Sequence, residues 1–371
     1  MALTIILSLS VLIVMGTYLF IMFTPDFGAS PTKQQKLAYA NSGHFEAGRF
    51  VNLIETNMDM DFKTIMGLIG EYFRGIPNSK PDFKLPVEKI DSTEVVLYIE
   101  KEPRITWFGH SAVLLEIGNK NILIDPMLSE SPSPHPWLGT KRYIDELPIE
   151  IQKIPQIDAI FISHDHYDHL DYKSILQLKD KTEQFYTPLG VGNHLIKWGV
   201  PRERVIEMNW WEETQFDSLF IACTPARHFS GRGITDRNST MWASWVIKSD
   251  EHAIYFSGDS GYGPHFKEIG NKYGPFDFAM MECGQYDLRW EAIHMLPGQT
   301  AQAGKEVNAK IVMPIHWGAF TLALHSWTDP VAQVTKAAEN YDFILTTPKI
   351  GEPIVINSGS YPKSKWWFRE D

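Results

Sequence analysis

This 371-residue chain contains only two cysteines, Cys223 and Cys283, both in apolar, strand-like surroundings. Two cysteines cannot build a disulfide framework, so we expect buried free thiols. Positive charge is also scarce, because 34 Lys and Arg residues against 45 Asp and Glu residues leave a net charge of −11. Nucleic-acid-binding surfaces hold phosphates with basic patches, so this balance argues against a nucleic-acid partner. With 44% hydrophobic residues and no short-period repeat, the composition is that of a globular protein.

Charge is wholly absent from residues 3–23. As a helix, a run of this length spans the roughly 30 Å hydrocarbon core of a bilayer, and we interpret it as an uncleaved, single-pass membrane anchor. A cleaved signal peptide is the alternative, but no Lys or Arg precedes the run and no clear A-x-A cleavage site follows it. Lys33, Lys36 and Arg49 lie after the run, so the positive-inside rule favours the cytoplasmic face for the rest of the protein.

The remaining chain divides into a connector with a helical extension over 24–94, a main domain over 95–360 and a tail over 361–371. Apolar residues at helical spacing predict a helix over 61–74, and we expect it to pack on the main domain rather than to lie on a membrane surface. The tail contains an aromatic and basic cluster at 365–369. This cluster either docks on the domain or sits at a membrane interface.

Short apolar runs in the main domain alternate with turn signals and helical patterns. The first predicted strands are separated by short turns, as in an antiparallel meander, and lie at 95–99, 104–108, 113–117 and 122–124. Further strands are expected at 160–162, 184–186, 205–208, 219–223, 242–247, 253–257, 278–282 and 311–314. Helices are expected at 171–178, 191–198, 264–272, 298–307 and 330–339. Two groups of strands interleaved with helices indicate two sheets packed face to face with helices outside.

Polar residues at 163–169 directly follow a predicted buried strand. Residues two apart in an extended segment point the same way, so His164 and His166 lie together. The turn that follows can bring Asp168 and His169 round to face them. Imidazole and carboxylate are ligands for zinc, iron and manganese, and burying so many titratable groups without a metal is costly. The stretch therefore predicts a site for two metal ions rather than a solvated helix N-terminus.

Three further candidate ligands lie just after predicted strands, namely His228, Asp259 and His316. Any one of them alone is more often a satisfied polar residue in a loop. Their repeated position after an apolar strand makes the set far more specific, because strand ends are where a site can collect ligands from separate parts of the chain.

The H-x-H-x-D-H pattern of His164, His166, Asp168 and His169 resembles the metallo-β-lactamase superfamily. The resemblance implies an α/β fold of αββα type, with two mixed β-sheets and outer helices, over the hydrolase domain 95–360. It also implies a ligand set for two metals, in which Asp259 bridges both: His164, His166 and His228 hold one, and Asp168, His169 and His316 hold the other. Seven ligands without a cysteine suit two zinc ions, with manganese or iron as alternatives.

Further stretches narrow the resemblance to the N-acylphosphatidylethanolamine-hydrolysing phospholipase D family and its bacterial relatives. The most discriminating are Trp210-Trp211-Glu212-Glu213 and His316-Trp317-Gly318, and the similar stretches cover most of residues 104–330. The resemblance implies a phosphodiesterase that cleaves N-acylphosphatidylethanolamine or a related phospholipid into phosphatidic acid and the released head group. The anchor lies outside the resemblance to the mammalian enzyme, so the substrate need not transfer.

The same resemblance implies catalytic roles for Asp168 and His294, and substrate contacts for Tyr167 and His294. For Tyr167 a packing role is the alternative, and for His294 an exposed loop position. Asp125 follows a predicted strand and is placed to accept a hydrogen bond from a ligand imidazole. His110 either does similar work or is a buried turn histidine.

Three arginines surround His228 in a glycine-rich loop, namely Arg227, Arg232 and Arg237. They supply the local positive charge that an anionic head group needs, although a solvated loop position is the more ordinary interpretation of Arg232 and Arg237.

Other functions compete with the phosphodiesterase. A lactonase or amide hydrolase acting on a small molecule fits the same metal pair, because that pair activates water equally well for acyl transfer. A non-catalytic metal-binding module is disfavoured, since all seven ligand positions are filled. The expected partners are a phospholipid substrate and the membrane that holds the anchor, and a homodimer is left open.

Overall fold

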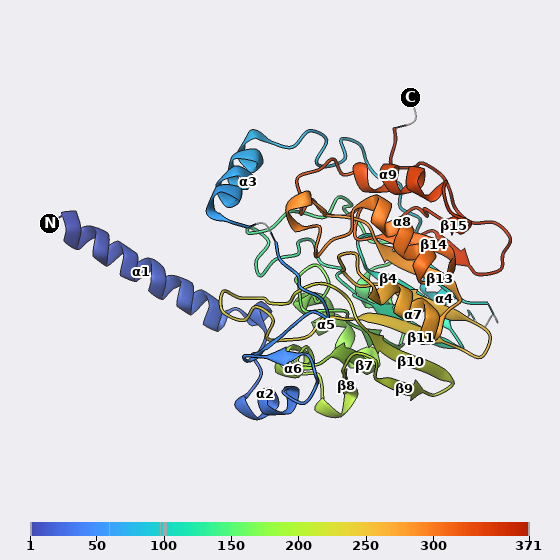
Figure 1. Ribbon diagram of the computed structural model, residues 1–371, viewed down its shortest axis with the longest axis horizontal. Coiled ribbons are helices and arrows are strands. Elements are labelled where there is room, and N and C mark those ends of the chain that lie inside the picture. Colours follow the sequence, from blue (N-terminus) through green and yellow to red (C-terminus); the bar gives the residue numbers. More distant parts are fainter. Residues whose placement is uncertain (1, 59, 97, 99–101, 370–371) are drawn as a thin grey trace.

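The computed structural model describes residues 2–369 except 59, 97 and 99–101. Two seven-stranded sheets lie face to face, and helices cover their outer sides (Figure 1). The predicted αββα sandwich of two mixed sheets is therefore confirmed.

The first sheet has the order β16-β3-β4-β5-β6-β7-β8. Its antiparallel part comprises β16 (Pro353–Val355), β3 (Arg104–Trp107), β4 (Val113–Ile117) and β5 (Lys120–Ile124). Its parallel part continues with β6 (Ile157–Phe161), β7 (Thr182–Pro188) and β8 (Val205–Met208). The outer helices α5 (Tyr172–Leu178) and α6 (Gly192–Lys197) connect the parallel strands, as predicted.

The strand predicted at 95–99 is wrong where the structure describes it, and residues 97 and 99 lie outside the described part. Ser92–Val96 instead forms the short helix α4. Asp91 favours this helix because its carboxylate accepts a hydrogen bond from the Thr93 amide at 2.9 Å, as an N-terminal cap does. The neighbouring place beside β3 is taken by β16, which comes from the other end of the domain.

The second sheet has the order β15-β14-β13-β12-β11-β10-β9. Its antiparallel strands are β9 (Glu213–Phe216), β10 (Leu219–Thr224), β11 (Ser244–Lys248) and β12 (Ala253–Phe256). Parallel strands follow: β13 (Phe276–Glu282), β14 (Ala309–Ile315) and β15 (Ile344–Leu345). The crossover helices are α7 (His265–Tyr273), α8 (Pro297–Glu306) and α9 (Asp329–Ala338), which confirms the helices predicted there.

Aromatic side chains fill the space between the sheets. Phe161 of β6 packs edge-on against Trp245 of β11 with ring centroids 5.2 Å apart, and the Trp245 indole donates a hydrogen bond to the Ile162 carbonyl. The parallel strands are apolar on both faces because outer helices bury the second face. Cys223 and Cys283 are buried free thiols, as expected, and burial raises the pKa of both.

The C-terminal tail docks on the domain. Trp366 and Trp367 are buried, and the Trp366 ring stacks on Trp317 at 5.2 Å. This decides between the two alternatives for the aromatic cluster, because side chains buried against the core cannot lie at a membrane interface. Phe368 is the half-exposed exception.

Helix α1 (Ala2–Phe23) projects from the body (Figure 1). Among the described residues it is the one helix long and apolar enough to cross a membrane, and none of its apolar window is buried. The chain then returns to the body through a short helical turn η1 (Pro25–Phe27), the capped helix α2 (Lys33–Tyr39) and the hairpin β1 (Phe45–Glu46) and β2 (Arg49–Phe50).

The predicted helix at 61–74 is confirmed as α3 (Phe62–Arg74), which Asp61 caps through a 2.7 Å bond from the Thr64 amide. The expectation that it packs on the domain by its apolar face is wrong. The structure describes every residue of α3, and none of them is buried. The apolar face points outward, and an ion pair on the opposite side, between Glu71 and Arg289, joins the helix to the body.

Candidate metal centre

The predicted ligands lie at one edge of the sandwich, where strands from both sheets end. The loop after β6 carries His164, His166, Asp168 and His169, while His228, Asp259 and His316 follow β10, β12 and β14. Carboxyl ends of parallel strands meet at a common edge, which is where open α/β folds assemble their sites. The structure thus brings all seven residues together from four separate segments.

Three imidazoles form the first group of ligand atoms. His166 Nδ1 lies 2.9 Å from His164 Nε2 and 3.1 Å from His228 Nε2. The other nitrogens of two of these rings are already engaged, with the Ser163 hydroxyl at 2.9 Å from His164 Nδ1 and the Ile293 carbonyl at 3.0 Å from His228 Nδ1. Burial lowers the pKa of all three histidines, so neutral imidazoles converge on one point.

Asp168, His169 and His316 form a second group, together with His110. Asp168 Oδ2 lies 2.8 Å from His110 Nε2, 3.1 Å from His316 Nε2 and 3.6 Å from His169 Nε2. We predicted His110 as a helper or a buried turn residue, and it is both fully buried and in direct contact with Asp168. Like the predicted ligands, His110 follows an apolar strand, and this signal identifies it in the sequence.

Asp259 lies between the two groups. Its Oδ2 atom is 3.1 Å from both His169 Nε2 and His316 Nε2, and 3.8 Å from His164 Nε2. The same oxygen is 3.9 Å from His228 Nε2. The carboxylate therefore touches the second group and reaches towards the first.

The site combines strong opposing electrostatic effects. Burial alone raises the pKa values of Asp168 and Asp259, but His169 and the other surrounding imidazoles outweigh it and hold both well below their usual range. Burial lowers and the carboxylates raise the pKa of His169, with a net rise to about 10. His316 is raised likewise, chiefly by Asp259. Two anionic carboxylates thus require positive charge among these ligand atoms.

The residues present fit a divalent metal. Ligand atoms 2.9–3.9 Å apart match the spacing around an ion that each of them binds at about 2.0–2.2 Å. Among the described residues, His169 Nε2 and Asp259 Oδ1 are buried without a hydrogen-bond partner. Buried polar atoms are normally satisfied, and a bound cation satisfies such atoms where no protein donor does.

Asp125 supports the second group as predicted. Its Oδ2 lies 2.7 Å from His169 Nδ1, and its Oδ1 accepts a hydrogen bond from the Ser163 amide at 2.7 Å. A carboxylate behind a ligand imidazole fixes the ring and its tautomer. Asp165, which we did not predict, holds the motif loop by accepting bonds from Thr240 Oγ1 and the Gly231 amide, both at 2.8 Å.

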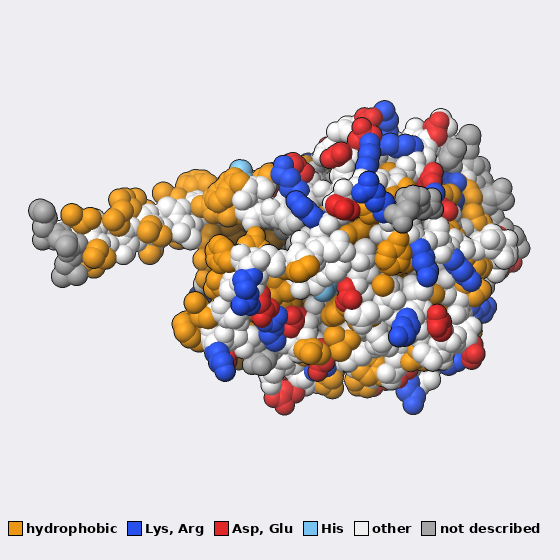
Figure 2. Space-filling model, turned by 90° about the horizontal axis from the view of Figure 1, so that it is seen from above, with side chains coloured by type: hydrophobic (Ala, Val, Ile, Leu, Met, Phe, Trp, Pro, Cys, Tyr) orange, Lys and Arg blue, Asp and Glu red, His pale blue; other side chains and the backbone are white. Residues whose placement is uncertain are grey.

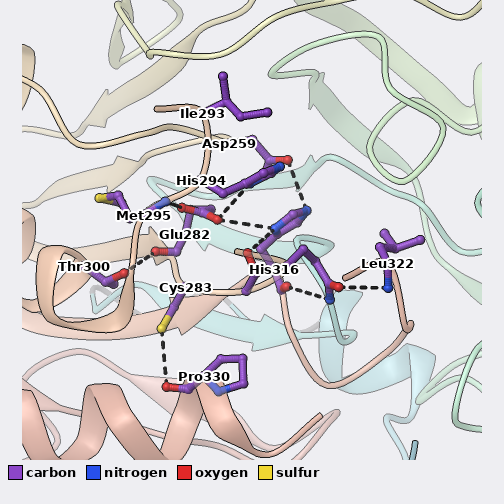
Figure 3. A network of polar contacts seen from close by, with 12 residues as sticks. Asp259, Glu282, Cys283, Ile293, His294, Met295, Thr300, His316, Leu322 and Pro330 are labelled. Carbon is purple, nitrogen blue, oxygen red and sulfur yellow. Dashed lines mark hydrogen bonds and ion pairs between the residues drawn. The ribbon is translucent and has the colours of Figure 1, made fainter. Parts of the chain in front are cut away.

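Glu282, at the end of β13, is another residue missed from the sequence (Figure 3). It is fully buried; its Oε1 lies 3.0 Å from His294 Nδ1 and its Oε2 accepts a bond from the Met295 amide at 2.9 Å. His294 in turn stacks on His316 with ring centroids 5.1 Å apart, so it belongs to the site. The available signal in the sequence was an acidic residue at the end of the apolar run 278–281.

Tyr167 and Arg232 pack on each other beside the motif. The Tyr167 hydroxyl donates to the Arg232 carbonyl at 2.7 Å, and the Arg232 guanidinium lies 4.0 Å above the Tyr167 ring. The solvated position expected for Arg232 is wrong, because its N–H groups satisfy the carbonyls of Asp165, Leu170 and Asp26. These contacts fix the motif loop to the segment that follows α1.

The two other arginines of the loop are also engaged. Arg227 donates to the carbonyls of Tyr262 and Glu55 and to Thr56 Oγ1. Arg237 is exposed, as expected, and its guanidinium lies 4.1 Å above the Phe229 ring. Partial burial lowers the pKa of both arginines. Neither guanidinium therefore points freely into the cluster, although both add positive charge near His228.

Comparison with known proteins agrees with this geometry. Residues 120–317 match the family model described as a beta-lactamase superfamily domain. The metallo-hydrolase Igni18 of Ignicoccus hospitalis superposes with a TM-score of 0.52 at 23% identity, covering 69% of this chain and 99% of the other, which shows the shared fold. The chain belongs to the beta-lactamase superfamily, as a metallo-hydrolase whose fold implies divalent metal ions.

Within that class, named relatives are more specific. N-acyl-phosphatidylethanolamine-hydrolyzing phospholipase D 1 of Caenorhabditis elegans is 30% identical, over 75% of this chain and 82% of its own length. An uncharacterised protein of Mycobacterium tuberculosis is 37% identical, over 88% and 87%. Outer membrane protein RomA of Klebsiella pneumoniae is 55% identical, over 28% of this chain and 76% of its own length. These comparisons confirm the resemblance inferred from the sequence.

Proposed function

We propose that this protein is a membrane-anchored phosphodiesterase of phospholipase D type, acting on N-acylphosphatidylethanolamine or a related phospholipid. The observation that carries the proposal is the position of Asp259 Oδ2 between two groups of ligand atoms, within 3.1–3.9 Å of four histidines. A carboxylate so placed suits a bridging ligand of two ions, which we propose to be zinc, with manganese or iron as alternatives. The similarity to the C. elegans phospholipase supports the substrate class.

The chain's own residues suit phosphodiester hydrolysis. A pair of bound metal ions supplies an activated water and neutralises charge on the attacking and leaving oxygens. Asp168 orients the second group through His110 and His316. His294, with Nδ1 against Glu282, presents its other face to the cluster and is positioned to hydrogen-bond the substrate phosphate. A bond forms between phosphorus and the water oxygen, the bond to the ethanolamine oxygen breaks, and that oxygen takes up a proton from the water, so that phosphatidic acid and an N-acylethanolamine leave.

Helix α1 supports the membrane location. Its apolar residues are exposed and continuous, which fits a bilayer better than water. We place the body on the cytoplasmic face because Lys33, Lys36 and Arg49 follow the helix. A reporter fused after residue 30 tests the side, and an external signal would overturn this orientation.

Mass spectrometry of the reaction products tests the activity. Purified, zinc-loaded protein is incubated with N-acylphosphatidylethanolamine, phosphatidylethanolamine and a panel of acyl-lactones. Appearance of an N-acylethanolamine together with phosphatidic acid, abolished by a chelator, is the expected result. Turnover of lactones with none of the phospholipids would keep the metal centre and replace the proposed function by that of a lactonase.

A further inference from the structure

Helix α3 presents an apolar face to the outside of the molecule. Phe62, Met66, Ile69 and Phe73 recur at positions that share one face of a helix, and they are 79%, 50%, 43% and 82% exposed. The opposite side meets the body through Glu71, whose two oxygens lie 3.0–3.2 Å from the Arg289 guanidinium. The outward direction of the apolar face is therefore held by a specific contact.

Helix α3 lies on the side of the body from which α1 projects. Both lie on the same side of the body, and α3 runs crosswise to α1 near the level where α1 enters the body (Figure 1). Hydrophobic side chains gather on this side of the molecule (Figure 2). Trp137, which is 70% exposed, lies at the base of α1 with its ring 6.5 Å from Phe20. Tryptophan is enriched where a bilayer meets water.

We propose that α3 lies in the headgroup layer of the bilayer that α1 spans, with its apolar face against the lipid. The inference rests on the proposed anchor. A helix with a strong apolar face and a crosswise direction is the kind that lies in a bilayer surface. Two contacts, α1 and α3, prevent the body from swinging about a single helix. Arg289, which pairs with Glu71 of α3, lies five residues before His294. The lipid contact of α3 is therefore connected through this pair to the edge of the metal centre.

Depth-dependent fluorescence quenching tests this in the full-length protein. Ile69→Cys carries an environment-sensitive dye in vesicles of phosphatidylcholine and phosphatidylglycerol, with native Cys223 and Cys283 buried. Brominated lipids are expected to quench this dye, as they quench one at Leu12→Cys, but not one at Asp342→Cys on the body. Quenching at Leu12 without quenching at Ile69 would overturn the inference and leave the anchor standing. If neither the Leu12 dye nor the Ile69 dye were quenched, the anchor would be contradicted as well. If the Ile69 dyes quenched one another and dilution with lipid did not change this, the apolar face of α3 would contact a second copy of the chain.

Activity gives a second measurement. Ile69→Glu places a charge on the apolar face, and we expect KM for vesicle-borne phospholipid to rise several-fold while turnover of a short-chain, soluble phosphodiester is unchanged. Leu37→Glu is the control, because Leu37 is also an exposed apolar residue, at 74%, but lies on α2. Equal effects of the two variants would contradict a specific role of α3.

A separate observation concerns Glu282. An ionised carboxylate accepts hydrogen bonds, so the 3.0 Å contact with His294 Nδ1 favours the tautomer that carries its proton on Nδ1. The Met295 amide holds the second carboxylate oxygen, and the Thr300 hydroxyl donates to the Glu282 carbonyl at 2.8 Å. Both His294 and the backbone beside it are therefore held by a residue from β13.

The remaining nitrogen of His294 faces the centre. The ring lies 5.0 Å from that of His228, and a nitrogen of His294 comes within 4.8 Å of ligand atoms of His228 and Asp259. Figure 3 shows His294 beside Asp259. Glu282 Oε1 also lies 3.6 Å from His316 Nδ1. We infer that Glu282 is a positioning residue, which directs His294 Nε2 towards the reacting phosphate and holds the His316 ring in place beside it.

A double-mutant cycle tests this role. Glu282→Gln keeps the size of the side chain, but its NH2 group would face either the His294 ring or the Met295 amide, donor against donor. We expect kcat to fall about 10–100-fold, with KM and metal content nearly unchanged. In the background of His294→Ala the same change is expected to cost little more. Glu116→Gln is the control, because Glu116 is a buried strand glutamate that pairs with Arg104 away from the site.

Three results would overturn the inference: additive losses in the cycle, loss of metal in proportion to activity, or an equal fall in kcat for Glu116→Gln. Should Glu282→Gln not fold, Glu282→Asp provides the same cycle, because it keeps the charge but withdraws it from His294. Full activity in both Glu282 variants would also count against the role.

Discussion

The N-terminal helices and the sandwich use apolar residues in opposite ways. In the sandwich, strands such as β13 bury their apolar side chains on both faces. In α1 and α3 most of the apolar side chains are exposed, although those of α3 recur at the spacing of a core helix. Burial of apolar area stabilises a fold by roughly 25 cal/mol per Å² only if something removes that area from water. The sandwich therefore covers its own apolar surface, whereas α1 and α3 leave theirs uncovered, and the bilayer we propose would supply that cover.

The largest predicted effect concerns the metal centre of the sandwich. Asp259→Asn removes a negative charge that contacts His169 and His316, and we expect loss of bound metal and a fall in activity of about 10³-fold or more. Elemental analysis of the metal-to-protein ratio measures it. Asp277→Asn, near the start of β13 where Asp277 pairs with Lys310, is the control. An unchanged ratio in Asp259→Asn would contradict the bridging role.

Removal of residues 2–23 tests whether the folded body depends on α1. We expect the shortened protein to move from the membrane fraction to the soluble fraction while metal content is retained, because residues after α1 hydrogen-bond to the body through the carbonyls of Pro25 and Gly28. Fractionation with metal analysis checks both statements. Loss of metal would show that α1 is part of the folded body rather than an anchor.

The tail offers a test of burial within the sandwich. Trp366→Ala removes a ring that stacks on Trp317 at 5.2 Å, and we expect a loss of about 3–5 kcal/mol in the free energy of unfolding. Phe368→Ala, in the half-exposed neighbour, is expected to cost far less. Denaturant titration measures both. Similar small losses for the two variants would indicate that the tail is not docked in solution.

The smallest effect is pH-dependent. Burial, with a smaller contribution from Arg227, lowers the pKa of His265 to about 3. Below pH 6.5 the unfolded chain binds a proton that the folded chain refuses, so stability falls as the pH drops from 6.5 towards 3, by at most about 1.4 kcal/mol per pH unit from this group. His265→Gln is expected to flatten this slope in denaturant titrations at pH 7 and pH 5.5. An identical slope in both proteins would rule out the contribution.

Local patterns were enough for most elements of the sandwich. Strands such as β4 and β14 are apolar runs bounded by turns, and the H-x-H-x-D-H stretch follows its strand without interruption. The strand predicted at 95–99 failed because a local cap at Asp91 competes with extension, and the place beside β3 went to a strand from the far end of the domain. Pairing partners distant in sequence leave no local signal.

What the sequence by itself determined is the set of residues able to bind metal and their positions after strands, because ligand chemistry and strand periodicity are local properties. Only the tertiary structure decided that His110 joins Asp168, that Glu282 reaches His294 and that Arg232 is buried, since these contacts join residues that no helical or strand periodicity relates. It also decided which way α3 faces. Helical periodicity identifies an apolar face, but the Glu71 contact with Arg289 turns that face away from the body.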